Sequence, residues 1–142
     1  MRRRHARGRC RSALAGGLLV VLAVSGCAPT PSPDPALVSL SQDALSYTRS
    51  AILGVDQEKD GLMFRTTATA LLGDMETKLA DLTREVALHR PADAEDAAYR
   101  TELLDASMAS LDAVQAAVRG GSGAEARLER AADRLAELGS AG

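Results

Sequence analysis

The sequence predicts an all-α fold: a small antiparallel up-down bundle of four helices, the fourth of them short, after a signal peptide and a proline-rich tether. Apolar residues recur at steps of three and four in four successive segments, which is the pattern of helices buried on one face. No segment alternates like a strand, and no internal repeat of 20 to 50 residues is visible. Connections of about six, three and three residues are short enough to pack each helix against the one before it.

The first helix is expected over about residues 35 to 55. Asp34 can cap its N-terminus, and Pro35 suits the first helical position, where no N–H is needed for the helix. The expected apolar face consists of Leu37, Leu40, Ala44, Tyr47 or Thr48, Ala51, Ile52 and Val55.

The second helix is predicted to start near Phe64 and to stop at Arg90-Pro91, because a proline disfavours helical geometry in the residue before it. Two acid–base pairs are expected on its flank, each contributing a few tenths of a kcal/mol. They are Asp74 with Lys78 and Asp81 with Arg84. The expected apolar face consists of Phe64, Ala68, Leu71, Met75, Leu79, Leu82 and Val86.

The third helix is predicted to begin at Asp93 and to end at Gly120-Gly121. Asp96 falls in its first turn, where a carboxylate complements the helix dipole. The expected apolar face consists of Ala97, Leu104, Met108, Leu111 and Val118. We expect the methionines on or beside the apolar faces to fill the core; they are Met63, Met75 and Met108.

The fourth helix is expected after Ser122 and Glu125, whose spacing is that of a capping box, and Gly139 is expected to end it. Its apolar face is predicted to contain Leu128, Ala131, Leu135 and Leu138. A fourth helix this short can leave part of the groove between its neighbours open.

Residues 1–26 have the features of a secretory signal peptide that is removed. Six arginines and no acid lie in residues 1–11, and residues 12–24 form a short apolar run, SALAGGLLVVLAV. A helix that spans a membrane needs about 20 apolar residues, whereas this run is shorter and contains two glycines.

Val24-Ser25-Gly26-Cys27 resembles the lipobox of bacterial lipoprotein precursors, in which an aliphatic residue, a small residue and Gly or Ala precede a cysteine. The resemblance implies that the Cys27 thiol receives a diacylglyceryl group, that a signal peptidase cuts between Gly26 and Cys27, and that the freed amine can receive an N-acyl chain. Two or more acyl chains anchor a protein stably. We therefore expect an exported protein anchored by lipid to the outer face of the bacterial cell membrane, with no other cofactor.

Cleavage would make the chain distinctly acidic. Six of the 17 basic residues precede Cys27 and all 19 acids follow it, so the chain from Cys27 would have a formal charge of −8. This charge disfavours binding to nucleic acid and to anionic lipid headgroups, which leaves the covalent lipid as the attachment to the membrane. Residues 27–35 are expected to form the lipidated cysteine and an extended tether, and residues 36–139 the bundle domain. Only 23 of the 116 residues from Cys27 to Gly142 are Leu, Ile, Val or Phe. The possibility that the chain folds only when it binds a partner therefore stays open.

An acidic segment between the first two helices partly matches a helix-loop-helix calcium site. Asp56, Glu58 and Asp60 occupy its first, third and fifth positions, and Gly61 the sixth. However, Thr67 at the twelfth position cannot supply the bidentate carboxylate that completes such a site. The three acids are therefore a weak calcium candidate, and an acidic capped turn is the commoner explanation.

No motif for catalysis is visible in the sequence, such as a nucleophile with its base, a glycine elbow or a phosphate loop. The one histidine after Cys27, His89, is interpreted as a helix-end ion pair with Glu85, since one such pair is too few for a metal site. We therefore expect a non-catalytic lipoprotein whose bundle binds a protein partner of the cell envelope. The alternative is an extracytoplasmic lipoprotein that binds a small ligand or calcium.

Overall fold

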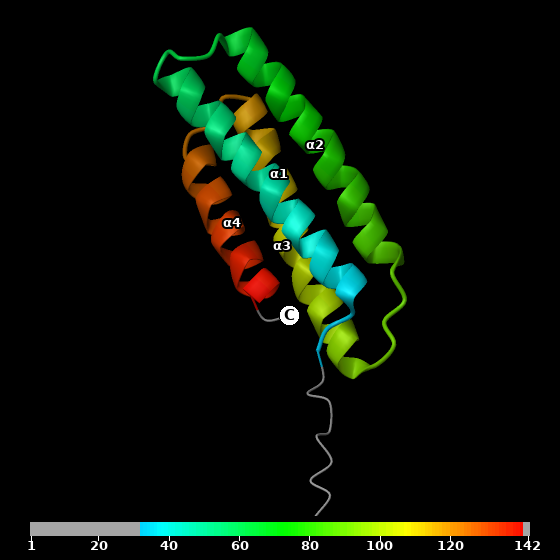
Figure 1. Ribbon diagram of the computed structural model, residues 1–142. Coiled ribbons are helices and arrows are strands. Elements are labelled where there is room, and N and C mark those ends of the chain that lie inside the picture. Colours follow the sequence, from blue (N-terminus) through cyan, green and yellow to red (C-terminus); the bar gives the residue numbers. More distant parts are fainter. Residues whose placement is uncertain (1–31, 141–142) are drawn as a thin grey trace, which may run out of the picture. The chain divides into compact units, whose positions relative to one another are not determined.

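Four helices joined by short connections make up most of residues 32–140, the part of the chain that the computed structural model describes (Figure 1). They are α1 (Pro35–Lys59), α2 (Arg65–Leu88), α3 (Ala94–Val118) and α4 (Ala124–Ser140). No strand occurs in this range. Successive helices run in opposite directions, and α4 is the shortest, with 17 residues. The predicted all-α up-down bundle with a short fourth helix is therefore confirmed.

The helices close into a ring, because each contacts the next along the chain and α4 also contacts α1. Across the ring, α1 touches α3, which lies behind it in Figure 1, whereas no contact joins α2 to α4 within the described residues. Interaxial distance depends on the side chains at the contact, and small ones allow a close approach. Both α1 and α3, which touch across the ring, bury small side chains. These are Ser41, Ala44, Thr48 and Ala51 on α1, and Ala106, Ser107, Ser110 and Ala113 on α3.

Leucines from all four helices fill the centre of the bundle. Burying one such side chain contributes about 1.5–3 kcal/mol relative to leaving it exposed. The leucines with no more than 2% of their surface exposed are Leu37, Leu72, Leu79, Leu103, Leu128 and Leu135. A polar link joins three helices beside them, since the Tyr99 hydroxyl lies 3.1 Å from Ser41 Oγ and 3.2 Å from the carbonyl oxygen of Leu138.

The buried face of α3 differs from the predicted one. Leu104 and Leu111 are only partly buried, and Met108 is 51% exposed, so Met108 does not fill the core as predicted. The side chains that α3 does bury are mostly small or carry a hydroxyl, which gives that face a weaker apolar signal than its leucine-rich flank. They are Asp96, Tyr99, Leu103, Ala106, Ser107, Ser110, Ala113, Val114 and Ala116. The prediction for Met75 is confirmed, because it is buried in the core.

The observed α1 extends to Lys59, four residues beyond the predicted end. It ends in a Schellman motif, in which the N–H of Gly61 donates to the carbonyl oxygen of Glu58 (3.1 Å) and that of Leu62 to the carbonyl oxygen of Gln57 (2.8 Å). Gly61 has φ +70, which glycine adopts without steric cost. At the other end of the domain α4 continues to Ser140, so Gly139 does not end it.

The residues just before α1 are fixed to the bundle. As predicted, Asp34 caps the helix, because its Oδ1 accepts the N–H of Ala36 at 2.8 Å, and Pro35 is the first helical residue. Pro33, which was assigned to the tether, is buried.

Asp34 also joins α1 to the connection between α2 and α3. Its backbone N–H donates to Oδ1 of the buried Asp96 at 2.8 Å, and Oδ2 of Asp96 accepts the N–H of Ala92 at 3.2 Å. His89 Nε2 lies 3.1 Å from Asp34 Oδ2, a close contact that is not aligned as a hydrogen bond. The predicted pairing of His89 with Glu85 is therefore wrong, because the tertiary fold offers His89 a nearer carboxylate.

Candidate functional site

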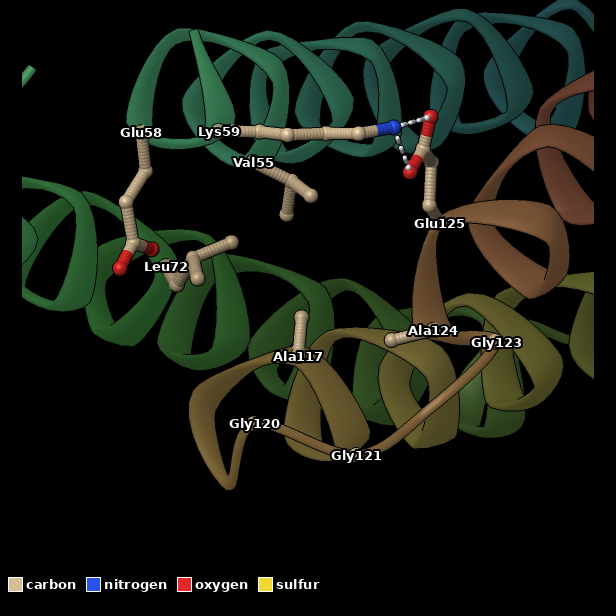
Figure 2. Close-up of a pocket in the computed structure, with 10 residues that line it drawn as sticks. All are labelled: Val55, Glu58, Lys59, Leu72, Ala117, Gly120, Gly121, Gly123, Ala124 and Glu125. Atoms are coloured by element: carbon tan, nitrogen blue, oxygen red, sulfur yellow. Dashed lines mark hydrogen bonds and ion pairs between the residues drawn. The ribbon is translucent and has the colours of Figure 1, made fainter. Parts of the chain in front are cut away.

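An open hollow lies at the end of the bundle remote from Asp34, where α1 and α3 end and α2 and α4 begin (Figures 1 and 2). We call this end, formed by residues 55–65 and 117–125, the tip. The 25 residues of α1 separate it from Asp34 by about 37 Å at roughly 1.5 Å per residue. The hollow has a volume of about 360 Å³. It is lined by Val55, Glu58, Lys59, Leu72, Ala117, Gly120, Gly121, Gly123, Ala124 and Glu125.

The lining of the hollow combines apolar side chains with charged groups and polar backbone. Figure 2 shows Val55 of α1 and Leu72 of α2 on one side, and Ala117 and Ala124 on the opposite side. None of its ten lining residues is a serine, cysteine or histidine. Its apolar side chains can contact an inserted apolar group, while Glu58, Lys59 and Glu125 add charges to the same lining.

Glycines form the wall between α3 and α4. Gly120 (φ +68) ends α3 in a second Schellman motif, with its N–H bonded to the carbonyl oxygen of Ala117 and that of Gly121 to the carbonyl oxygen of Ala116. A Cβ on Gly121 would lie 3.0 Å from that Ala116 oxygen. The predicted end of the third helix at Gly120-Gly121 is confirmed. Because glycines have no side chain, only backbone lines the hollow on this side.

The predicted capping box of the fourth helix is not formed. Gly123 has φ +71 and separates Ser122 from α4, so the Ser122 side chain is not at the capping position. Instead, the Glu125 carboxylate accepts two contacts from Lys59 Nζ of α1, at 3.0 Å and 3.3 Å (Figure 2). The hydrogen bond that Lys59 donates to Glu125, together with the negative charge of Glu125, raises the pKa of Lys59, and the charges of Asp56 and Asp60 act in the same direction. This ion pair forms one rim of the hollow.

The connection between α1 and α2 carries the two most exposed large apolar side chains of the described residues. Leu62 is 78% exposed and Phe64 is 85% exposed. The sequence placed Phe64 on the buried face of the second helix, which is wrong because Phe64 precedes α2 and its side chain faces solvent. Its spacing from Ala68 fits a helical face, and only the observed start of α2 at Arg65 removes it from that face.

A loose ion pair borders the same part of the tip. Arg65 Nε lies 4.0 Å from Glu58 Oε1, and the Arg65 side chain is 80% exposed. Its Nη2 would lie 3.8 Å from a Cβ on Gly120, which places the guanidinium beside the hollow. The Arg65 guanidinium therefore keeps most of its donors free for water or a binding partner.

The three candidate calcium ligands do not lie in a loop. Asp56 and Glu58 belong to the last turn of α1, and Asp60 is the residue that ends it. Gly61 explains the misleading pattern, because a Schellman ending and a calcium loop both require a glycine for a sharp change of chain direction. Among residues 32–140, no three His, Cys, Asp or Glu side chains are grouped so that they could hold a metal ion.

Cys27 and the other lipobox residues, Val24, Ser25 and Gly26, lie outside the described residues, as does most of the tether. Across the described helices, none is both long and apolar enough to cross a membrane. In comparisons with known proteins, the chain matches no protein family model, no curated protein and no solved structure.

Proposed function

We propose that this protein is a lipoprotein of the bacterial cell envelope, anchored through lipid on Cys27, whose bundle binds a protein of the envelope through its tip without catalysing a reaction. The binding role is supported by the exposed side chains of Leu62 and Phe64 beside the hollow, whose exposed fractions are 78% and 85%. Exposed apolar groups of this size commonly mark interaction sites, because water solvates them poorly. Their place at the end remote from the anchored residues keeps them accessible.

The proposed anchor rests on the sequence of residues 24–27 and on charge. Two or three acyl chains give stable attachment, whereas one gives marginal, reversible binding. The formal charge of −8 from Cys27 onward offers little attraction to anionic headgroups, so the lipid itself must hold the protein. The eight residues from Ala28 to Pro35 would reach about 25 Å when extended.

Processing of Cys27 tests the anchor. We expect Cys27→Ser to keep residues 1–26 and to take up no labelled fatty acid, because the thiol that carries the lipid is gone. The matched control is Cys10→Ser, which removes the only other cysteine and leaves the lipobox intact. Electrophoretic size and fatty-acid labelling in a bacterial host give the result, and a Cys27→Ser protein that still matures and still carries lipid contradicts the proposal.

Recovery of a bound protein tests the tip. The full chain is expressed in its own cells, treated with a cross-linker and purified from membranes, together with the double variant Leu62→Ser and Phe64→Ser. We expect this variant to lose the cross-linked protein, while Leu88→Ser, which alters a 75% exposed leucine at the other end of α2, retains it. Equal recovery from the tip variant and from the control excludes the tip as the binding end.

The alternative, a calcium-binding lipoprotein, has less support because Asp56 and Glu58 lie in a helix rather than in a loop. Calorimetric titration with millimolar calcium tests it directly. Binding heat that disappears in Asp60→Asn would favour this alternative over the binding of a protein.

A further inference from the structure

We propose that the tip binds the tip of a second copy of this chain, with Phe64 of each copy entering the hollow of the other. The proposal rests on the proposed function, in which the tip is the binding end, and it names the partner. It depends on three properties of the tip: the size of the hollow, the charges on its rim and the symmetry of two copies anchored in one membrane.

The hollow is large enough for the side chain that lies next to it in the sequence. An engineered apolar cavity of about 150 Å³ admits benzene. The hollow at the tip measures about 360 Å³ and has the apolar side chains of Val55 and Ala117 in its lining. A phenyl ring from a second copy therefore fits, with room for part of Leu62. Phe64 is the only phenylalanine of the chain, and its side chain is the most exposed among the large apolar ones described.

The charges around Phe64 and around the hollow are complementary. Phe64 is followed by Arg65, whose exposed guanidinium makes only one loose contact, 4.0 Å from Glu58 of its own copy. The rim of the hollow carries Glu58, which makes only that loose contact, and Glu125, which is already paired with Lys59 at 3.0 Å. An inserted Phe64 would bring its Arg65 to Glu58 of the other copy, where a planar guanidinium can bind a carboxylate through two hydrogen bonds.

Anchoring in one membrane favours a symmetric dimer, in which each copy makes the same contact with the other. Two copies held in one membrane can be related by a two-fold axis along the bundles, and such an axis places both tips at the same height. Each copy then gives one Phe64 and receives one, so the contact closes at two copies rather than growing into a fibre. The tip alone is small for an interface, and association depends on the high local concentration that anchoring provides.

Photo-cross-linking in the intact envelope tests the pair. A benzophenone amino acid replaces Leu62 in the full chain, so that Phe64 and the hollow stay unchanged. We expect a cross-linked dimer whose joined peptides include residues 117–125 of the second copy. Phe64→Ala in the same chain should reduce the dimer by about ten-fold or more, since a buried phenyl ring is a large part of such a contact. Leu88→Ala should leave the yield unchanged.

A mixing experiment separates loss of the contact from loss of folding. Ala117→Leu fills the hollow from its own wall, while Phe64→Ala removes the inserted ring, and each variant carries a different tag. A mixed pair keeps one intact Phe64 and one intact hollow, so the two variants together should cross-link more than either alone. Phe64 is exposed, so its removal leaves the fold intact and the Phe64→Ala result stands even if Ala117→Leu is unstable. Cross-linking of Leu62 to a different protein overturns the proposed pair but supports the proposed function, and the absence of any cross-link overturns both.

Discussion

The backbone N–H of Asp34 donates to the carboxylate of Asp96, 62 positions later in the chain, at 2.8 Å. Asp34 caps α1, while Asp96 stands in the first turn of α3 and is buried. The Asp96 carboxylate also accepts the N–H of Ala92. It therefore joins the start of α1 to the connection between α2 and α3.

Asp96→Ala should destabilise the bundle by about 2 kcal/mol, because it leaves two backbone N–H groups without their acceptor in a partly buried place. Thermal and urea unfolding measure the change. Glu95→Ala is the matched control, as Glu95 is an exposed acid in the same turn whose side chain makes no hydrogen bond or ion pair within the described residues, and its loss should change stability by under about 0.5 kcal/mol. An Asp96→Ala protein as stable as the control would show that solvent replaces the carboxylate.

The fold was predictable because α2 and α4 bury leucine, valine or methionine side chains at helical spacing, and α1 adds Leu37 with several partly buried apolar side chains. Asp34, Pro35 and Gly120 also marked helix ends correctly, since each has a local stereochemical reason to be there. The face of α3 was not predictable in this way. Ser107 and Ser110 are polar in the sequence, and their burial depends on the packing of α3 against the other three helices.

The tip was only partly predictable. The sequence indicated that a short fourth helix would leave a groove open, and the hollow beside the start of α4 agrees with that expectation. The positions of Lys59 and Glu125, 66 residues apart, depend on how α1 and α4 align in space. Phe64 illustrates the same limit: its periodicity fits the α2 face, and a one-residue shift in the start of the helix changes it from buried to exposed.

Ser107→Ala and Ser110→Ala should each leave stability unchanged or raise it, by up to about 1 kcal/mol. Both hydroxyl groups are fully buried, and neither has a hydrogen-bond partner in the described structure. Alanine removes the unpaired polar group and also favours the helix. The melting temperatures of the two variants give the answer, and Thr48→Ala provides the contrast because the Thr48 hydroxyl donates to the carbonyl oxygen of Ala44 at 2.7 Å. A clear loss of stability in both serine variants would show that these hydroxyls are paired.

Two glycines should respond to alanine in opposite ways. Gly61→Ala should destabilise the protein by about 1 kcal/mol, because Gly61 has φ +70 in the Schellman ending of α1. Gly73 lies inside α2, where a Cβ would meet no atom within 4 Å. Gly73→Ala should therefore stabilise the protein by up to about 1 kcal/mol. Urea unfolding of both variants measures the two changes, and a change of the same sign in both would contradict the observed backbone geometry.

The ion pair at the tip should make stability depend on alkaline pH. Glu125 raises the pKa of Lys59 above its ordinary value of 10.5 in the folded protein. The stabilisation is therefore complete below that ordinary value and is lost as the pH rises through the higher folded value. Glu125→Gln should lower the melting temperature at about pH 8, and the difference from the parent protein should disappear once the pH has risen past the folded-state pKa of Lys59, which lies above 10.5. The effect is small and should shrink in high salt, because both side chains are solvent-exposed. Glu129→Gln, one turn further along α4, tests for a general effect of charge, since no basic group within the described residues pairs with Glu129. If the difference between Glu125→Gln and the parent protein stayed constant across this pH range, the Lys59–Glu125 contact would not form in solution.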